Sequence, residues 1–489
     1  FFLASRYKYV YNKIKIHEKG EVCGMLFSSA TFLFFFLPVV LIIYYNPMIQ
    51  NRQFQNIFLL IASVFFYAWG EPVYVILMLL SISVNYLLGI FVENFRDTPY
   101  EKMPVVIAGI FNIGVLFLFK YLRFFCENLM VITGQDWNIP NIYLPIGISF
   151  YTFQAISYVV DVYRQKGEVQ RNPLNVGLYI TFFPQLIAGP IVRYETISWE
   201  IENRQENARD FTEGVTRLIW GLGKKVLIAN NAAILADACF ADPSNLLAGA
   251  AWIGIISYAI QIYFDFSGYS DMAIGLGRMF GFHFLENFNY PYIASSIQDF
   301  WRRWHISLST WFRDYVYIPL GGSRTKKKSR MVRNLFIVWA LTGLWHGANW
   351  TFLIWGIFYF VLLLIEHMTD FPKKLGKFGH IYTLLCVLIG WVFFRADSVH
   401  EAFLYLKAMA GGNGMGSQAV GWAALPIGNL IFVAIGIIGS TPILSKLELK
   451  NKDKKWWNLI SGLMTMIVFI FAVSEVVNTS YNPFIYFNF

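Results

Sequence analysis

Residues 332–365 of this chain read VRNLFIVWALTGLWHGANWTFLIWGIFYFVLLLI, and this stretch indicates the kind of fold. A transmembrane helix needs about 20 apolar residues to cross the hydrocarbon core, so the stretch is too long for one ordinary span. The segment GLWHGAN, at residues 343–349, interrupts it with glycine and polar side chains. We therefore expect half-helices or re-entrant segments here.

Apolar runs recur along the rest of the chain. Of its 489 residues, 56% are hydrophobic, 19% aromatic and 14% charged, so the bilayer is its main solvent. The pattern predicts an all-α polytopic membrane protein with about ten to twelve transmembrane or re-entrant helices. The candidate segments are Phe32–Tyr45, Phe54–Trp69, Val73–Phe91, Val105–Phe125, Ile142–Tyr163, Val176–Ile191, Val215–Leu235, Gly249–Phe266, Val332–Ile365, Ile381–Phe394, Val420–Ile438 and Trp456–Val477.

No soluble linker or fixed-period repeat divides these segments, so residues 25–489 are predicted to form a single membrane domain. Residues 1–24 are basic and rich in tyrosine, and they lack the apolar core and cleavage site of a signal peptide. Met25 follows them and opens a strongly apolar run. Our hypothesis is that Met25 is the true start and that residues 1–24 are an upstream extension outside the fold.

The formal net charge of +9 does not point to nucleic acid. Lys and Arg occupy short connecting segments such as residues 326–328 and 373–377, which is typical of cytoplasmic loops. Contact with a phosphate or a carrier is the alternative role for these charges. The four cysteines show no CxxC pair or metal-ligand spacing, so we expect packing roles and no metal site.

Residues 299–324, DFWRRWHISLSTWFRDYVYIPLGGSR, place several charges between aromatic side chains. On a continuous helix Trp301, His305, Leu308 and Phe312 would share one face, and the charged residues would share another. The segment predicts either an interfacial helix anchored by Trp and Arg or a helix that lines a polar cavity. The candidate site residues are Arg302, His305, Arg313 and Asp314.

A second candidate segment, LTGLWHGANW at residues 341–350, holds the lone histidine His346. Gly343 and Gly347 are four residues apart, so another helix backbone or a thin ligand can approach closely. Asn349 lies one helical turn from His346 and is a candidate for orienting its ring. A neutral histidine can take a proton from an attacking hydroxyl, although a structural histidine bonded between helices is the alternative interpretation.

A third segment, QIYFDFSGYSDMAIGLG at residues 261–277, carries Asp265 and Asp271 in an apolar setting. Buried carboxylates must be paired or protonated. Arginines of residues 299–324 are plausible partners, which would make the aspartates a scaffold for the site.

Taken together, residues 301–324, 341–356, 261–277, ISFYTFQAISYVVDVYR at 148–164 and FFPQLIAGPIVR at 182–193 resemble the membrane-bound O-acyltransferase family. Within that family the chain looks like the alginate O-acetyltransferase branch, from about Met25 to the terminal NPFIYFNF. The resemblance implies helices around a central tunnel, with His346 as the catalytic residue and His305 as the second histidine. We expect Asn349, Arg302, Arg313, Asp314 and Asp265 to be candidates for substrate binding.

The resemblance also implies a reaction. An acetyl group from a cytoplasmic thioester donor, expected to be acetyl-CoA, would pass across the membrane to a hydroxyl of an extracellular or cell-wall polysaccharide such as alginate. The reaction requires no bound cofactor or metal. The resemblance also implies an extracytoplasmic acetyltransferase as partner. The location would be the inner membrane of a bacterium, spanned many times.

Two other functions remain open from the sequence. The sister branch transfers D-alanine from a small acyl-carrier protein towards teichoic acid and shares the histidine flanked by tryptophan. A transporter or flippase of an envelope precursor would also have broken helices and buried charges.

Overall fold

The computed structural model describes residues 25–48, 51–140, 142–323, 327–369, 371–414, 420–421, 424–478 and 485. The hypothesis about residues 1–24 falls outside these residues. Within them the chain is helical and forms no β-strand, and a single bridge joins Leu246 to Val420. The predicted all-α fold is confirmed.

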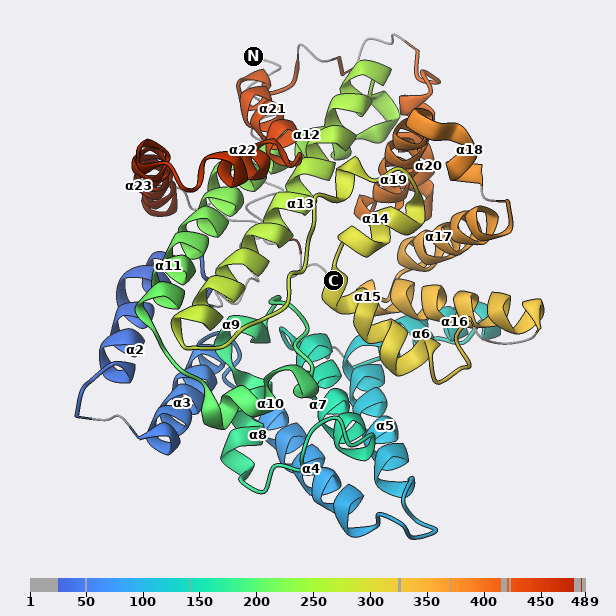
Figure 1. Cartoon of the computed structure of the whole chain (residues 1–489). Helices are drawn as coiled ribbons and strands as arrows, with labels where there is room; N and C mark the ends of the chain where they lie inside the picture. The colour runs from blue at the N-terminus through green and yellow to red at the C-terminus, as the bar shows by residue number, and fades with distance from the viewer. Residues whose placement is uncertain are drawn as a thin grey trace.

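The first half of the chain contains both short and long helices (Figure 1). They are η1 (Phe32–Phe36), α2 (Leu37–Tyr44), α3 (Arg52–Gly70), α4 (Tyr74–Asn94), α5 (Met103–Leu116), η2 (Phe117–Tyr121), α6 (Leu122–Thr133), α7 (Ile148–Tyr163), α8 (Pro173–Thr181), α9 (Phe183–Leu186), α10 (Tyr194–Asn203), α11 (Ala208–Gly223), η3 (Lys224–Ala229) and α12 (Asn230–Phe240).

The second half begins with the long helix α13 (Ala248–Met279), which runs through the middle of the molecule in Figure 1. The remaining elements are η4 (Pro243–Asn245), η5 (Pro291–Ile293), α14 (Ile297–Arg303), α15 (Ile306–Phe312), η6 (Arg313–Tyr317), α16 (Lys328–His346), α17 (Trp350–Thr369), α18 (Phe371–Leu375), η7 (Gly376–Phe378), α19 (Gly379–Arg395), α20 (Val399–Met409), η9 (Ile427–Asn429), α21 (Leu430–Gly439), α22 (Ile443–Asn451) and α23 (Lys455–Asn478).

Seven helical segments in the described part of the chain are long and apolar enough to cross a membrane. They are residues 52–70, 74–94, 103–133, 208–240, 350–369, 376–395 and 455–478, and the bent pair α21 and α22 makes an eighth if it counts as one span. The other predicted segments form shorter or more deeply buried helices. The multi-pass architecture is confirmed, and the predicted number of ten to twelve segments stays a prediction.

Helix α13 forms the centre of the core because glycines let neighbouring helices approach its backbone. A Cβ on Gly221 of α11 would lie 2.7 Å from the carbonyl oxygen of Gly268, and one on Gly214 would lie 2.6 Å from that of Gly275. Only glycine fits such close backbone contacts. The helix is buried along most of its length, so it is a scaffold for the elements around it.

The predicted break at residues 343–349 is confirmed. Helix α16 ends at His346 and α17 begins at Trp350, so the two form an antiparallel hairpin. A Cβ on Gly343 would lie 2.5 Å from the carbonyl oxygen of Phe352, which shows how closely the two backbones pack. The expected close approach at this glycine is therefore made by the backbone of α17.

The continuous helix expected through residues 301–313 is wrong. Helix α14 ends at Arg303, and His305 adopts a left-handed conformation with φ 45° before α15 begins. The break changes the helical phase, so the predicted face of Trp301, His305, Leu308 and Phe312 does not exist as one stripe. Glu366 of α17 accepts hydrogen bonds from the backbone N–H groups of Ile297 and Gln298 and so fixes the start of α14.

Basic residues gather at one end of the α16–α17 hairpin. The hairpin turns at residues 347–349, so the start of α16 at Lys328 and the end of α17 at Thr369 lie at the same side. Trp350, at the turn, donates to Asn128 of α6, which places the end of α6 at the opposite side. Residues 134–147, which follow α6, contain one aspartate and no lysine or arginine. Under the positive-inside rule, the side with Lys328 is expected to face the cytoplasm.

Candidate active site

His346 lies in the aromatic core at the end of α16. Its side chain is only 5% exposed, and its ring centroid lies 5.0 Å from Trp355, 4.9 Å from Phe394 and 4.8 Å from Trp345. Its Nδ1 has no hydrogen-bond partner among the described residues. A buried imidazole without a structural hydrogen bond at this nitrogen favours a chemical role over the structural alternative.

Two cavities meet at His346. The first has a volume of about 80 Å³ and the second about 10 Å³. Within the described chain, His346 is the one residue that lines both. The first is lined by Lys120, Leu144, Pro145, Ile146, Gly147, Ile148, Ser149, Phe150, Ile187 and Trp345, and the second by Ile262, Phe266, Trp304, Trp355, Trp391 and Phe394. The first cavity therefore gives access to the imidazole, and the second, with room for about one water molecule, adjoins it on the other side.

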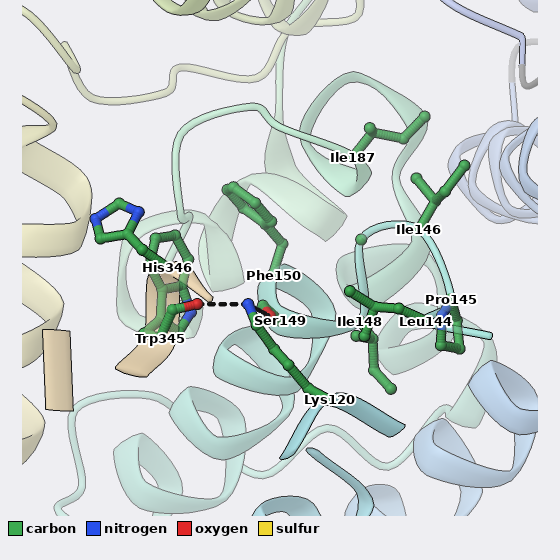
Figure 2. A pocket seen from close by; sticks show the side chains of 11 residues that line it. Lys120, Leu144, Pro145, Ile146, Ile148, Ser149, Phe150, Ile187, Trp345 and His346 are labelled. Carbon is green, nitrogen blue, oxygen red and sulfur yellow. Dashed lines mark hydrogen bonds between the residues drawn. The ribbon is translucent and has the colours of Figure 1, made fainter. Parts of the chain in front are cut away.

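Figure 2 shows the first cavity from close by. His346 lies at one end of the labelled residues, and Leu144 and Pro145 of the loop before α7 lie at the other. Lys120 points between them towards the carbonyl oxygen of Trp345, to which it donates a hydrogen bond. Tyr121 donates to the carbonyl oxygen of Leu344 at 2.9 Å. Lys120 and Tyr121 therefore hold the last turn of α16, on which His346 sits.

His305 is the second buried histidine, and Asn287 fixes its ring. Its Nδ1 lies 3.1 Å from Asn287 Oδ1, and the same oxygen accepts from Ser307 Oγ at 2.9 Å and from the Ser307 backbone N–H at 3.2 Å. Because the backbone N–H can only donate, this atom of Asn287 is the amide oxygen, and His305 Nδ1 carries the proton. The neutral ring therefore presents an unprotonated Nε2, which has no partner among the described residues.

The ring of Trp345 contacts both histidines. Its centroid lies 4.8 Å from that of His346 and 5.9 Å from that of His305. Phe266, which lines the second cavity, packs edge-on against His305 at 4.6 Å. The structure thus brings the two predicted histidines into one aromatic cluster, although 40 residues of sequence lie between them.

The other candidates from residues 299–324 lie outside the two cavities. Arg302 is exposed on α14, and Arg313 pairs with Asp314 at 2.7 Å. Asp314 also accepts from Arg193 at 2.6 Å. Burial raises the pKa of Asp314, but the hydrogen bond and charge of Arg313 and the charge of Arg193 outweigh it and hold that pKa below its ordinary value. These residues form an ionic network that ties η6 to the segment after α9.

The expected pairing of the aspartates with arginines of residues 299–324 is wrong. Asp265 pairs with Lys225 of η3 at 2.6 Å, and both side chains are buried. Its other oxygen accepts from the backbone N–H of Ile485 at 2.9 Å. Asp271 pairs with Arg217 and Lys224, at 2.7 and 2.6 Å. The aspartates hold α13 to α11 and η3, as a scaffold does, but with partners from another part of the chain.

Asn349 does not orient the imidazole of His346. Its Nδ2 donates to the carbonyl oxygen of Asp397 at 3.1 Å, and its Oδ1 accepts from the Thr351 backbone N–H at the same distance. The asparagine instead fixes the turn between α16 and α17, because the chain leaves the helix at Gly347 and Asn349 no longer lies above His346.

Lys120 is the residue that the sequence interpretation missed. The signal was present, since Lys120 and Arg123 interrupt the apolar run LFLFKYLRFF at residues 116–125, and a charged residue inside a span marks a functional candidate. Ser149 was also missed, because nothing in the sequence places the start of α7 beside residue 120.

Comparison with known proteins identifies the family of this chain. The profile of MBOAT, the membrane-bound O-acyltransferase family, matches residues 169–394, which include both histidines. A probable alginate O-acetylase from Pseudomonas putida is 38% identical over 492 residues, covering 95% of this chain and all of that protein. The peptidoglycan O-acetyltransferase of Helicobacter pylori is 36% identical over 430 residues, covering 81% of each chain. The teichoic acid D-alanyltransferase of Bacillus subtilis is 34% identical over 266 residues, covering 51% of this chain and 66% of that protein.

Proposed function

Because this chain belongs to the membrane-bound O-acyltransferase family, in the branch of the alginate O-acetylases, and is a membrane O-acetyltransferase, we propose that it acetylates an envelope polysaccharide. The donor is a cytoplasmic thioester, acetyl-CoA, and the acceptor hydroxyl comes from the opposite side of a bacterial inner membrane. An extracytoplasmic acetyltransferase receives or directs the acetyl group as a partner. The acetyl donor rather than a D-alanyl carrier is favoured by the length over which the acetylase relatives match.

The observation that carries this proposal is the place of His346 between two cavities. A transfer reaction needs a donor and an acceptor at one base, and separate approaches keep the thioester away from bulk water until the acceptor arrives. A transporter or flippase does not need a histidine in such a position.

The chemistry follows from a neutral imidazole. His346 takes the proton of the acceptor hydroxyl while its oxygen attacks the thioester carbonyl carbon. The carbon–sulfur bond then breaks, the ester remains on the acceptor, and the proton passes from His346 to the leaving thiolate.

His305 has a different role in this proposal. Its Nδ1 proton is held by Asn287, so its neutral Nε2 can accept but not donate a hydrogen bond. We assign it to accept a hydrogen bond from a second hydroxyl of the acceptor, which positions the reacting hydroxyl at His346, and the developing oxyanion requires another donor.

The test uses membranes that contain the protein, radiolabelled acetyl-CoA and isolated envelope polymers. Wild type is expected to label a polymer, and His346→Ala at equal expression is expected to lose about a thousandfold or more of that activity, because the base is removed. His367→Ala, which changes an exposed histidine at the end of α17, is the matched control. Equal labelling by His346→Ala and wild type would refute the mechanism, and labelling only from a D-alanyl carrier protein would favour the sister reaction.

A further inference from the structure

The second cavity beside His346 is small and deeply buried. Its volume of about 10 Å³ leaves room for about one heavy atom with its hydrogens. Every side chain that lines it is at least nine-tenths buried. These side chains come from α13, the break between α14 and α15, α16, α17 and α19, and they are Ile262, Phe266, Trp304, His346, Trp355, Trp391 and Phe394.

The rings around this cavity hold one another in place. The centroid of Trp391 lies 4.9 Å from that of Trp304 and 5.4 Å from that of Phe394. Phe394 in turn lies 5.2 Å from Trp355 and 4.9 Å from His346. Rings packed at these distances cannot move aside without losing contacts, so the size of the cavity is fixed by its walls.

The lining of the cavity is apolar. No Asp, Glu, Lys or Arg is among its residues, and the only titratable side chain is His346. The indole N–H groups of Trp355 and Trp391 are buried within the protein, so carbon atoms form most of the surface. Such a surface favours an apolar group, and an ammonium placed there would lose its water without gaining a counter-ion.

We propose that this cavity holds the methyl group of the acetyl donor and that Ile262 of α13 limits the length of the acyl group that can be transferred. The inference rests on the proposed function, because it assigns the cavity to the acyl donor. When the thioester carbonyl lies beside His346, the carrier of the thioester and the sugar are both far too large for this space. Only the methyl end of the acyl group is small enough to enter.

Ile262 is the residue through which this limit can be tested. It is 3% exposed and is the one aliphatic side chain among those that line the cavity. Shortening it enlarges the cavity and leaves every aromatic ring around His346 in the chain. A propionyl group is one methylene longer than acetyl, and one methylene in a pocket of fixed size changes selectivity by about 10-fold to 200-fold.

Binding is measured first, because it does not depend on turnover. The probes are ketone analogues of acetyl-CoA and propionyl-CoA in which a methylene group replaces the thioester sulfur, and each is titrated calorimetrically into the full-length protein in detergent. Wild type is expected to bind the acetyl analogue at least about tenfold more tightly than the propionyl analogue. Ile262→Ala is expected to bring the two affinities within about threefold, and Ile262→Val, which removes a single methyl group, to narrow the difference by a smaller factor.

Ile255→Ala is the matched control. Ile255 lies in the same helix, is fully buried and lines neither cavity, so this change removes the same atoms from the core without enlarging the pocket. It is expected to keep the preference of wild type for the acetyl analogue. Equal binding of the two analogues by wild type would overturn the inference, as would an unchanged preference in both Ile262→Ala and Ile262→Val.

A D-alanyl analogue separates size from charge. It has the carbon skeleton of the propionyl analogue and carries an ammonium group in addition. Ile262→Ala is expected to admit the propionyl analogue and still to exclude the D-alanyl analogue by at least about tenfold, because the lining offers no carboxylate. Equal binding of these two probes by Ile262→Ala would contradict the apolar character assigned to the pocket.

Transfer from radiolabelled acetyl-CoA and propionyl-CoA then distinguishes this inference from the proposed function. In kcat/KM, wild type is expected to favour acetyl by about 10-fold to 200-fold, and Ile262→Ala to lose most of that preference. If the analogues bind as expected but no acetyl reaches a polymer, the proposed acceptor is wrong while the pocket stands. If wild type binds neither the acetyl nor the propionyl analogue, CoA is not the donor and the inference falls with it.

Discussion

Asn287 holds the second histidine through a single oxygen atom. Oδ1 accepts from His305 Nδ1 and from both the side chain and the backbone of Ser307. Its Nδ2 donates to Ser270 Oγ at 3.0 Å, which anchors the amide to α13. The orientation of His305 is therefore set by a residue that lies 18 positions earlier in the chain.

Asn287→Ala is expected to lower both stability and activity. It leaves a buried imidazole N–H and the Ser307 donors without an acceptor, which costs about 1–3 kcal/mol. Loss of the correct ring orientation is expected to lower acetyl transfer by about tenfold to a hundredfold. Thermal unfolding in detergent and the radiolabel assay measure the two effects. Ser270→Ala, which leaves the contacts of Oδ1 intact, is the control, and unchanged transfer by Asn287→Ala would contradict the role given to His305.

The ion pairs of Asp314 make part of the stability depend on pH. Because the folded pKa of Asp314 is lower than its ordinary value, its contribution is complete above the unfolded pKa of about 4 and is lost as the pH falls through the lower folded value. Asp314→Asn is expected to unfold at a lower temperature than wild type at pH 7. The difference should shrink as the pH falls below about 4. Asp136→Asn, at an exposed aspartate, should show no such dependence, and a gap that stays constant with pH would refute the assignment.

The residues predicted best from the sequence were those whose surroundings lie close in the chain. His346 and His305 stand in short segments rich in tryptophan, and the structure places them in one aromatic cluster. The partners of Asp265 could not be predicted from local pattern. Lys225 lies 40 residues before Asp265, and only the packing of η3 against α13 brings them together.

At the scale of elements, the position of His346 depends on how closely α16 and α17 pack. Gly343 faces the backbone of α17, where a Cβ would meet the Phe352 carbonyl oxygen at 2.5 Å and Gly356 Cα at 3.4 Å. Backbone atoms cannot move aside as a flexible side chain can. The last turn of α16 therefore relies on a residue without a side chain three positions before His346.

Gly343→Ala is expected to separate the two helices and to displace His346. Overpacking of this kind costs about 1–3 kcal/mol, and a displacement of about 1 Å lowers transfer by up to about a hundredfold. Thermal unfolding and initial rates of acetyl transfer check both. Gly109→Ala in α5 is the matched control, because a Cβ there meets nothing within 4 Å. If Gly343→Ala matched that control in both measurements, the close packing would have no part in placing the histidine.

Elements were predictable where apolar runs ended at polar or glycine-rich segments, as at the turn after His346. The break after Arg303 was not, because the residues on both sides have ordinary helical propensity. Two tertiary features cause it, the left-handed conformation of His305 and the hydrogen bond from Ile306 N–H to the carbonyl oxygen of Asn287. Residues 287–306 fold back so that their two ends meet. Nothing in the local sequence around Arg303 indicates this contact.

At the scale of the whole molecule, charge divides the two sides of the membrane domain. Exposed Lys374 follows α17 at the basic side, and exposed Asp136 follows α6 at the other. The number of spans could not be fixed from hydropathy alone, since several apolar segments are short, bent or buried inside the protein. Sidedness rests on the distribution of basic residues, which is visible in the sequence once the helices are known.

Cysteine labelling tests this sidedness. In a background in which the four native cysteines are replaced, Asp136→Cys is expected to react in intact cells with a thiol reagent that does not cross the membrane. Lys374→Cys is expected to react only after the cells are opened, because basic loops stay in the cytoplasm. The reverse pattern would turn the first cavity towards the cytoplasm and would contradict this assignment of sides.

Four helical segments in the described part of the chain wind as π-helix: η1, η2, η3 and η6. Three of them carry the ionic residues discussed above, namely Lys120, Lys225 and Asp314. A π turn holds one more residue than the α turn it replaces, which rotates everything after it by about 100° relative to an unbroken helical wheel. These charges therefore lie where the helices change phase, and a helical wheel drawn with regular periodicity from the first residue of each helix would misplace the residues that follow them.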